Sequence, residues 1–320
     1  MSENNDVILK VEGLKTYFYQ ASGVTKAVDG VSFTIEQGKT LGIVGESGCG
    51  KSTLGRVIVQ LLDATDGQIL FDGRNVTNLR GHDLKIFRKN MQMIFQDPFS
   101  SLNPRMTVAQ AIAEPLRNYP EALGGRNLDE YIHAVMDTVG LAQRLRNSYP
   151  HELDGGRRQR IGIARALALN PKFIVCDEPV SALDVSIQAQ ILNLMMDLQD
   201  DKGLTYMFIT HDLSVVKHIA DDIGVMYLGN LVEKCEAKEI FRKPLHPYTQ
   251  ALLSAIPTIN IDIPPKRIPL KGEITSPIDP KPGCRFAPRC PRATERCFAQ
   301  TPALREVEQG HFVACHEAQL

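Results

Sequence analysis

A stretch early in the chain has the residue types and the spacing needed to hold the phosphates of a nucleotide. Positions 45–52 fit the pattern G-x-x-x-x-G-K-[ST], between an apolar strand-like run and a segment with helical spacing. Glycines let the backbone turn tightly so that its N–H groups point at an anion, and the following helix adds its positive N-terminal end. We expect Lys51 to reach the β- and γ-phosphates and the Ser52 hydroxyl to ligate Mg²⁺. The cradle consists of Gly45, Glu46, Ser47, Gly48, Cys49, Gly50, Lys51, Ser52 and Thr53.

Two acidic residues follow a second apolar run, at positions 173–176. Asp177 closes the run and could hold Mg²⁺ through water, and Glu178 stands next to it. A carboxylate at that place can accept a proton from the attacking water as a general base. Paired acids often end a strand in solvent without any role, and the phosphate cradle alone would also suit a kinase or a GTPase. Together, the two motifs favour hydrolysis of a terminal phosphate.

Two more polar residues close apolar runs in the same manner. Gln96 follows residues 93–95, and its neutral amide could contact Mg²⁺ or the attacking water. His211 follows residues 206–209 and is predicted to contact the γ-phosphate. In isolation, each of them would be interpreted as a surface or structural residue.

A second anion site is predicted around a Gly-Gly pair. Asp154, Gly155 and Gly156 open a helix that continues to about residue 167, so bare backbone donors again face an anion. One nucleotide does not need two cradles so far apart in sequence. Two chains packed head to tail would use both, because each chain would then close the other's nucleotide.

A group of cysteines lies near the C-terminus, in a Pro- and Arg-rich tail. Four thiolates suit a tetrahedral Zn²⁺ or a cubane iron–sulfur cluster, and disulfides are not expected in a reducing cytoplasm. Four unligated thiols in a flexible tail are the alternative. The four residues are Cys284, Cys290, Cys297 and Cys315.

The whole chain has an ordinary globular composition. Of its 320 residues, 43% are hydrophobic and 23% charged, and the formal net charge of -1 gives no sign of a nucleic-acid partner. No apolar run approaches the roughly 20 residues that cross a bilayer, and the N-terminus lacks a signal-peptide core. We therefore expect a cytoplasmic protein that reaches a membrane only through other proteins.

Buried strands alternating with helices must position these residues. Such an alternation predicts an α/β fold with a largely parallel sheet covered on both faces. Prolines become frequent after residue 256 and indicate a linker to a small C-terminal module. Strands are expected at residues 8–11, 31–35, 41–44, 173–176, 206–209 and 223–227, and helices at 128–139, 158–167, 186–199 and 213–220.

The order of these motifs resembles that of an ABC-transporter nucleotide-binding domain over residues 7–240. The phosphate loop, the glutamine loop at Gln96, the signature at 153–157, the carboxylate strand, the loop at 181–184 and the histidine loop follow one another as in that family. The resemblance implies a P-loop NTPase fold with a mainly parallel sheet, an antiparallel β subdomain and a helical subdomain at about 97–168. It also implies ATP hydrolysis in a head-to-tail dimer. An aromatic residue near the N-terminus would stack on adenine, with Phe18 as the candidate and Tyr17 as the alternative.

A closer resemblance is to the ATPases of dipeptide and oligopeptide permeases. It rests on residues 45–50, 101–105 and 246–253 and on the cysteine-rich tail. It implies an ATPase domain over residues 1–255 and a permease-type extension over 256–320 that carries a 4Fe-4S cluster, with Zn²⁺ as the alternative. The implied partners are a second, related ATPase chain, two integral membrane permease subunits and, indirectly, an extracytoplasmic substrate-binding protein. The chain would then work on the cytoplasmic face of the membrane.

The signature departs from the usual Leu-Ser-Gly-Gly-Gln at two positions. Asp154 replaces the serine and Arg157 replaces the glutamine. A carboxylate facing a phosphate is repelled by roughly 4 kcal/mol per pair of unit charges at about 4 Å and an effective dielectric of about 20. Arg157 could offset this by pairing with Asp154 or with the phosphate. We therefore expect the partner's ATP to be hydrolysed less well, or to require the Asp154–Arg157 pair.

Two alternatives remain at this point. A catalytically weak, nucleotide-gated regulatory subunit would agree with the altered signature, although Glu178 argues against it. A soluble ABC ATPase of DNA repair or translation would usually carry long coiled coils or two ATPase domains, and the sequence shows neither.

Overall fold

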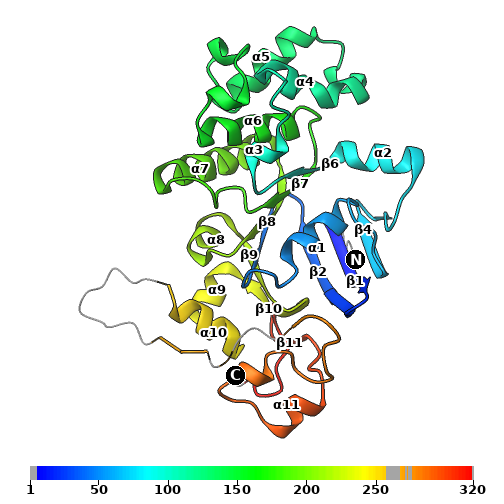
Figure 1. The fold of residues 1–320 in the computed structure, drawn as a ribbon, viewed down its shortest axis with the longest axis vertical. Coiled ribbons are helices and arrows are strands. Elements are labelled where there is room, and N and C mark those ends of the chain that lie inside the picture. Colours follow the sequence, from blue (N-terminus) through cyan, green and yellow to red (C-terminus); the bar gives the residue numbers. More distant parts are fainter. Residues whose placement is uncertain (1–5, 257–266, 271, 273–275, 319–320) are drawn as a thin grey trace, which may run out of the picture. The chain divides into compact units, whose positions relative to one another are not determined.

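The computed structural model describes residues 6–256, 267–270, 272 and 276–318 (Figure 1). The chain divides into two compact units: a first unit of residues 1–78 and 208–320, and a second unit of residues 79–207. Strand β8 (Thr205–Thr210) crosses the boundary between them along the chain. Part of the predicted Pro-rich linker lies outside the described residues.

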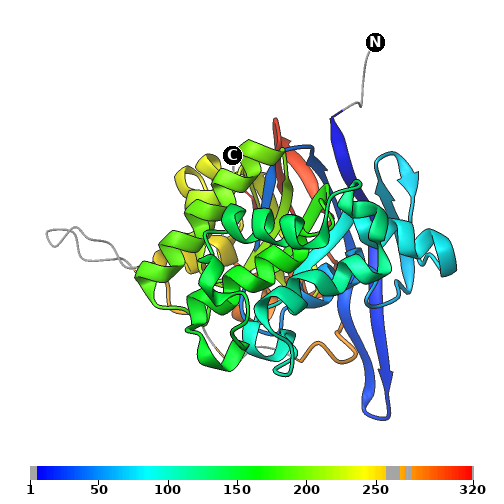
Figure 2. The same cartoon turned by 90° about the horizontal axis from the view of Figure 1, so that it is seen from above.

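The first unit contains a sheet built on a long hairpin. Strands β1 (Val7–Gln20) and β2 (Gly23–Glu36) pair antiparallel, and β4 (Asp66–Phe71) and β5 (Arg74–Asn75) extend the sheet in the order β2-β1-β4-β5. Figure 2 shows the hairpin as a long blue ribbon. The predicted strands at 8–11 and 31–35 are only the buried inner parts of β1 and β2. The outer parts were missed because they are half-exposed and pair mainly with each other.

A second sheet of the first unit leads directly to the phosphate loop. Strand β3 (Thr40–Val44) is buried along its whole length and runs parallel to β9 (Asp222–Tyr227). Antiparallel strands β10 (Asn230–Glu236), β12 (His311–Val313) and β11 (Arg305–Glu308) follow in the order β11-β12-β10-β9-β3. Before its C-terminal part, the helices described in this unit are α1 (Lys51–Ile58), α8 (Leu213–Ile219), α9 (Ala237–Arg242) and α10 (Pro247–Ser254).

The C-terminal module, residues 276–318, is packed into the first unit. It contains the short helices η4 (Ala287–Arg289) and α11 (Glu295–Ala299) as well as β11 and β12, drawn in orange and red in Figure 1. Phe286 is fully buried against the rings of Tyr227 and Tyr248, with centroid distances of 5.2 and 5.3 Å. The module therefore shares its core with β9 and α10.

The second unit is mostly helical around one parallel pair of strands. Strands β6 (Met91–Ile94) and β7 (Phe173–Asp177) pair in the register Ile94 to Cys176. Helix α4 begins with a capping box formed by Thr107 and Gln110, which satisfies donors that a helix start leaves free. The helices are α2 (Gly81–Asn90), α3 (Pro98–Ser101), α4 (Val108–Asn118), α5 (Leu128–Thr138), α6 (Gly155–Leu167) and α7 (Val185–Lys202), with short 3-10 turns η1 (Pro120–Leu123), η2 (Gln143–Leu145) and η3 (Pro150–Glu152).

Among the described residues, none of the helices combines the length and the apolar character that crossing a membrane requires.

Candidate functional site

The phosphate loop has backbone positions that only glycine can occupy. Gly45 has φ 154°, and a Cβ atom there would lie 2.2 Å from the Met226 carbonyl oxygen. Gly50 has φ 104°, and its Cβ would lie 2.0 Å from the Ala27 carbonyl oxygen. The loop therefore turns sharply between β3 and α1 because both glycines lack side chains.

Lys51 lies inside this turn. Its side chain is 4% exposed, and its ammonium donates hydrogen bonds to the carbonyls of Gly45 (2.8 Å) and Glu46 (3.0 Å). Helix α1 starts here, so the N–H groups of its first turn and the lysine belong to the same turn. The geometry is that of an anion cradle, and Ser52 and Thr53 occupy the next two helical positions, half-buried.

The predicted adenine-stacking residues lie on the β1–β2 hairpin. Tyr17 donates its hydroxyl to Asp29 at 2.5 Å, and the Lys26 ammonium lies 5.4 Å from the centre of its ring. Burial, followed by this hydrogen bond, raises the pKa of Tyr17. Phe18 is half-buried and pairs with Thr25 across the hairpin. Adenine stacking by Phe18 stays a prediction.

His211 also lies in the first unit, directly after β8. It is exposed, and the next residue, Asp212, caps helix α8 by accepting from the Ser214 N–H at 2.7 Å. The cap fixes the chain immediately after the histidine.

In the second unit, the structure brings Gln96 and Glu178 together. Both residues lie two positions beyond the paired residues Ile94 and Cys176 of the parallel strands. The Gln96 amide donates to the Glu178 carboxylate at 3.1 Å. Asp177 ends β7 and is 1% exposed. A buried carboxylate, a second carboxylate and an amide at the neighbouring ends of β6 and β7 form an oxygen-rich group that can bind a hard cation and orient water.

The signature segment begins helix α6. Asp154 is its N-cap residue, and its carboxylate accepts from the Arg157 N–H at 2.8 Å. The Arg157 guanidinium lies 3.4 Å from the other carboxylate oxygen, so the ion pair considered from the sequence is formed. Gly156 needs its small size, because a Cβ would lie 2.7 Å from a methyl of Ile187.

The four cysteines of the C-terminal module line one small cavity, together with His246 and Phe286. Their thiols are free, and burial raises the pKa of Cys284 to about 11 and also raises those of Cys290 and Cys315. Within the part of the chain that the structure describes, no three metal-ligating side chains form a group that could hold an ion. The four thiols line this cavity, but the described residues give no support to the predicted iron–sulfur or zinc site.

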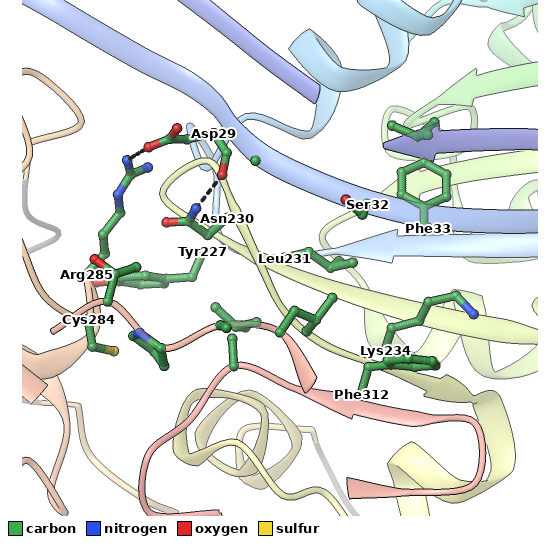
Figure 3. Close-up of a pocket in the computed structure, with 18 of the residues that line it drawn as sticks. Asp29, Ser32, Phe33, Tyr227, Asn230, Leu231, Lys234, Cys284, Arg285 and Phe312 are labelled. Carbon is green, nitrogen blue, oxygen red and sulfur yellow. Dashed lines mark hydrogen bonds and ion pairs between the residues drawn. The ribbon is translucent and has the colours of Figure 1, made fainter. Parts of the chain in front are cut away.

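Sequence reasoning missed a larger cavity of about 700 Å³ between the hairpin, β10 and the C-terminal module. Figure 3 shows Arg285 reaching Asp29 at its wall, where Asn230 also donates to the Asp29 carbonyl at 2.6 Å. Arg285 further donates to the Leu228 carbonyl. These bonds join the C-terminal module to the hairpin, and no local sequence pattern would have indicated them.

Comparisons with known proteins show the family to which the chain belongs. A family model for ABC transporters matches residues 28–181, and a model for the C-terminal region of oligopeptide/dipeptide transporters matches residues 232–297. The oligopeptide transport ATP-binding protein AppF of Bacillus subtilis is 52% identical over 98% of both chains. OppF of Salmonella typhimurium, also named an oligopeptide transport ATP-binding protein, is 49% identical over 98% of this chain and 97% of its own.

Solved structures show the same fold. The ATP-binding cassette MJ0796, solved as a dimer with ADP and Pi, matches with a TM-score of 0.66 and 28% identity over 72% of this chain and 99% of that chain. CbiO1 of Clostridium perfringens, part of an ABC transporter complex, matches with a TM-score of 0.65 and 29% identity over 75% of this chain and 92% of its own.

Proposed function

Because this chain belongs to the family of ABC transporter ATP-binding subunits, we propose that it hydrolyses ATP to drive a membrane importer of dipeptides or oligopeptides. The peptide cargo is supported by the names of the relatives and by the match of residues 232–297 to the transporter C-terminal region. The observation that carries the ATPase function is the pairing of Glu178 with Gln96 at the strand end, beside the buried Asp177.

The residues take these roles in the proposed reaction. Lys51 and the loop N–H groups bind the β- and γ-phosphates, and Ser52, Asp177 and Gln96 would hold Mg²⁺. Glu178 accepts a proton from the attacking water. The water oxygen bonds to the γ-phosphorus, and the bond between that phosphorus and the bridging oxygen, which leaves with ADP, breaks. His211 would contact the γ-phosphate as it leaves.

ATP lies between two subunits in this proposal. The N-terminus of α6, with Asp154, Gly155 and Gly156, would close the nucleotide held by a second, related ATPase chain. Two integral membrane permease subunits would receive the motion on the cytoplasmic face of the membrane, and an extracytoplasmic binding protein would deliver the cargo. The family matches give no support to the alternative of a soluble ABC ATPase outside transport.

A transport experiment tests this function. The chain, its partner ATPase and the permeases are purified together from membranes and placed in proteoliposomes with the binding protein. We expect uptake of a labelled oligopeptide that depends on Mg-ATP. Purification without integral membrane partners, or uptake that proceeds without ATP, would contradict the proposal.

The altered signature favours one second candidate, a nucleotide-gated subunit with weak hydrolysis at one site. In the proposed dimer, the Asp154 carboxylate would face the partner's phosphate, and its ion pair with Arg157 would neutralise it in part. In this candidate, ATP bound to the partner holds the dimer closed, while this chain's own ATP is turned over.

A metal group in the C-terminal module is a separate proposal. The four cysteines share one cavity, which supports a 4Fe-4S cluster or, alternatively, Zn²⁺, but their described arrangement does not fit either group without movement. When bound, such a group would staple a module that contains little regular structure. Anaerobic purification with iron and zinc analysis tests this, and protein with neither metal would remove the proposal.

A further inference from the structure

The phosphate loop is held from outside the ATPase motifs, at Glu46. This residue is the second of the loop, and its carboxylate receives both terminal nitrogens of Arg289, at 2.7 and 3.1 Å. Arg289 comes from η4 of the C-terminal module and is only 8% exposed. A bidentate ion pair of this kind fixes the direction of the carboxylate and also neutralises its charge.

The backbone of Glu46 is held as well. Its N–H donates to the hydroxyl of Tyr248 at 2.9 Å, and the Tyr248 side chain is fully buried in α10. The Tyr248 ring packs edge to face on Tyr227, with centroids 4.7 Å apart, and lies close to Phe286. Arg289 also donates to the Tyr227 hydroxyl at 3.4 Å, so both anchors of Glu46 contact the same buried aromatic cluster.

Lys51 depends on the same residue. Its ammonium donates to the carbonyl of Gly45, which belongs to the peptide unit that Tyr248 holds, and to the carbonyl of Glu46, which belongs to the next one. A shift of Glu46 would move both carbonyls and the lysine with them. Without Arg289, the Glu46 carboxylate would also be an uncompensated negative charge on the loop that binds the phosphates.

We propose that Arg289 and Tyr248 are positioning residues of the ATP site, through which the C-terminal module fixes the phosphate loop and neutralises Glu46. The inference rests on the proposed ATP binding. It gives the module a direct part in nucleotide affinity, whether or not the cysteines hold a metal.

The test is equilibrium binding of mant-ATP with Mg²⁺ to the purified full-length chain. We expect R289M to weaken Kd about tenfold and R289K, which keeps the charge but loses the two-point geometry, about threefold. In the assembled ATPase, KM for ATP should rise for R289M while kcat at saturating ATP changes less than about twofold. R296M, at an exposed arginine of the same module that bonds Gln300, is the matched control and should bind as wild type does.

Removing the charge of Glu46 distinguishes an effect of Arg289 on Glu46 from a general effect of Arg289 on the stability of the fold. We expect E46Q to bind within about threefold of wild type, and E46Q/R289M to bind close to E46Q, because the carboxylate that Arg289 neutralises is then absent. An R289M variant that binds normally, or one whose defect is the same with and without the Glu46 charge, overturns the inference. If R289M does not fold, Y248F tests the inference instead. We expect it to weaken the affinity for mant-ATP about threefold, and an unchanged affinity would contradict the positioning role.

The two proposals fail in different ways. Wild-type protein that does not bind mant-ATP would overturn the proposed function, and this inference with it. Wild-type protein that binds, with R289M and Y248F binding equally well, would overturn only the positioning role.

Discussion

At the scale of single residues, Glu178 combines its place beside Gln96 with an uncommon backbone conformation. Its φ of 47° lies in the left-handed region, where a non-glycine residue costs about 1–3 kcal/mol. The Ser181 N–H and hydroxyl both donate to the Glu178 carbonyl, at 3.3 and 3.1 Å, and help to hold this conformation. The backbone and the Gln96 amide together fix the direction of the carboxylate, as a general base requires.

Replacing Glu178 by Gln should separate ATP binding from hydrolysis. The amide keeps the size of the side chain but cannot accept a proton, so we expect phosphate release to fall by about 10²–10⁴-fold. Binding of mant-ATP should stay within about twofold of wild type, and an ATP-bound dimer should accumulate on size exclusion.

The control is E130Q, at an exposed glutamate of helix α5 in the same unit. Its phosphate release should equal that of the wild type. Hydrolysis by E178Q at the wild-type rate would assign the proton transfer to another group.

At the scale of elements, the N-terminal cap of helix α10 depends on the protonation state of His246. Its Nδ1 accepts from the Tyr248 N–H at 3.1 Å and so caps the helix. Burial lowers the pKa of His246 to about 4 from 6.5; the Glu233 carboxylate opposes this shift and Arg292 adds to it. A protonated ring would lose the acceptor, because both of its nitrogens would carry hydrogen.

The depressed pKa of His246 predicts how stability changes with pH. Above pH 6.5 this group is neutral in both the folded and the unfolded chain. Between pH 6.5 and 4 only the unfolded chain takes up the proton, so the free energy of unfolding falls, by about 2 kcal/mol at pH 5 relative to pH 7.

The variant H246N should remove this part of the pH dependence, because asparagine can cap a helix but does not titrate. Urea unfolding followed by circular dichroism at pH 7 and pH 5 measures the difference from wild type. H133N, at an exposed histidine of α5, should keep the wild-type slope. Equal slopes for H246N and wild type would show that His246 is accessible to protons in the folded chain.

Local pattern explains which elements could be predicted from the sequence. The runs at 41–44 and 173–176 are found as β3 and β7, because short buried strands are continuous apolar segments. The phosphate loop followed from its glycines and lysine. Arg289 could not be found in this way, because it lies 243 positions from Glu46 and its neighbours form no motif that points to the loop. The arrangement of the four thiols also depends on the folded module rather than on their spacing.

At the scale of the whole molecule, the altered signature distinguishes this chain from a partner ATPase that carries the usual Leu-Ser-Gly-Gly-Gln. The Asp154–Arg157 pair is about half exposed, so it neutralises the carboxylate only in part. In the proposed head-to-tail dimer, this signature would act on the partner's ATP, while Lys51 and Glu178 would act on the chain's own. The two sites of one transporter would then hydrolyse ATP at different rates.

Restoring the usual signature should therefore speed up the assembled transporter. We expect D154S/R157Q to raise ATPase activity of the complex about two- to fivefold, and R157Q alone to lower it about tenfold, because it leaves Asp154 uncompensated before the phosphate. Both variants keep the cap of α6, because serine also caps helices and the cap bond uses the backbone N–H of residue 157. Effects in opposite directions would therefore report that Asp154 faces a nucleotide. The measurement is phosphate release by the purified complex at saturating Mg-ATP. R144Q, at an exposed arginine outside the signature, is the control, and unchanged activity of both signature variants would mean that α6 does not close the partner's site.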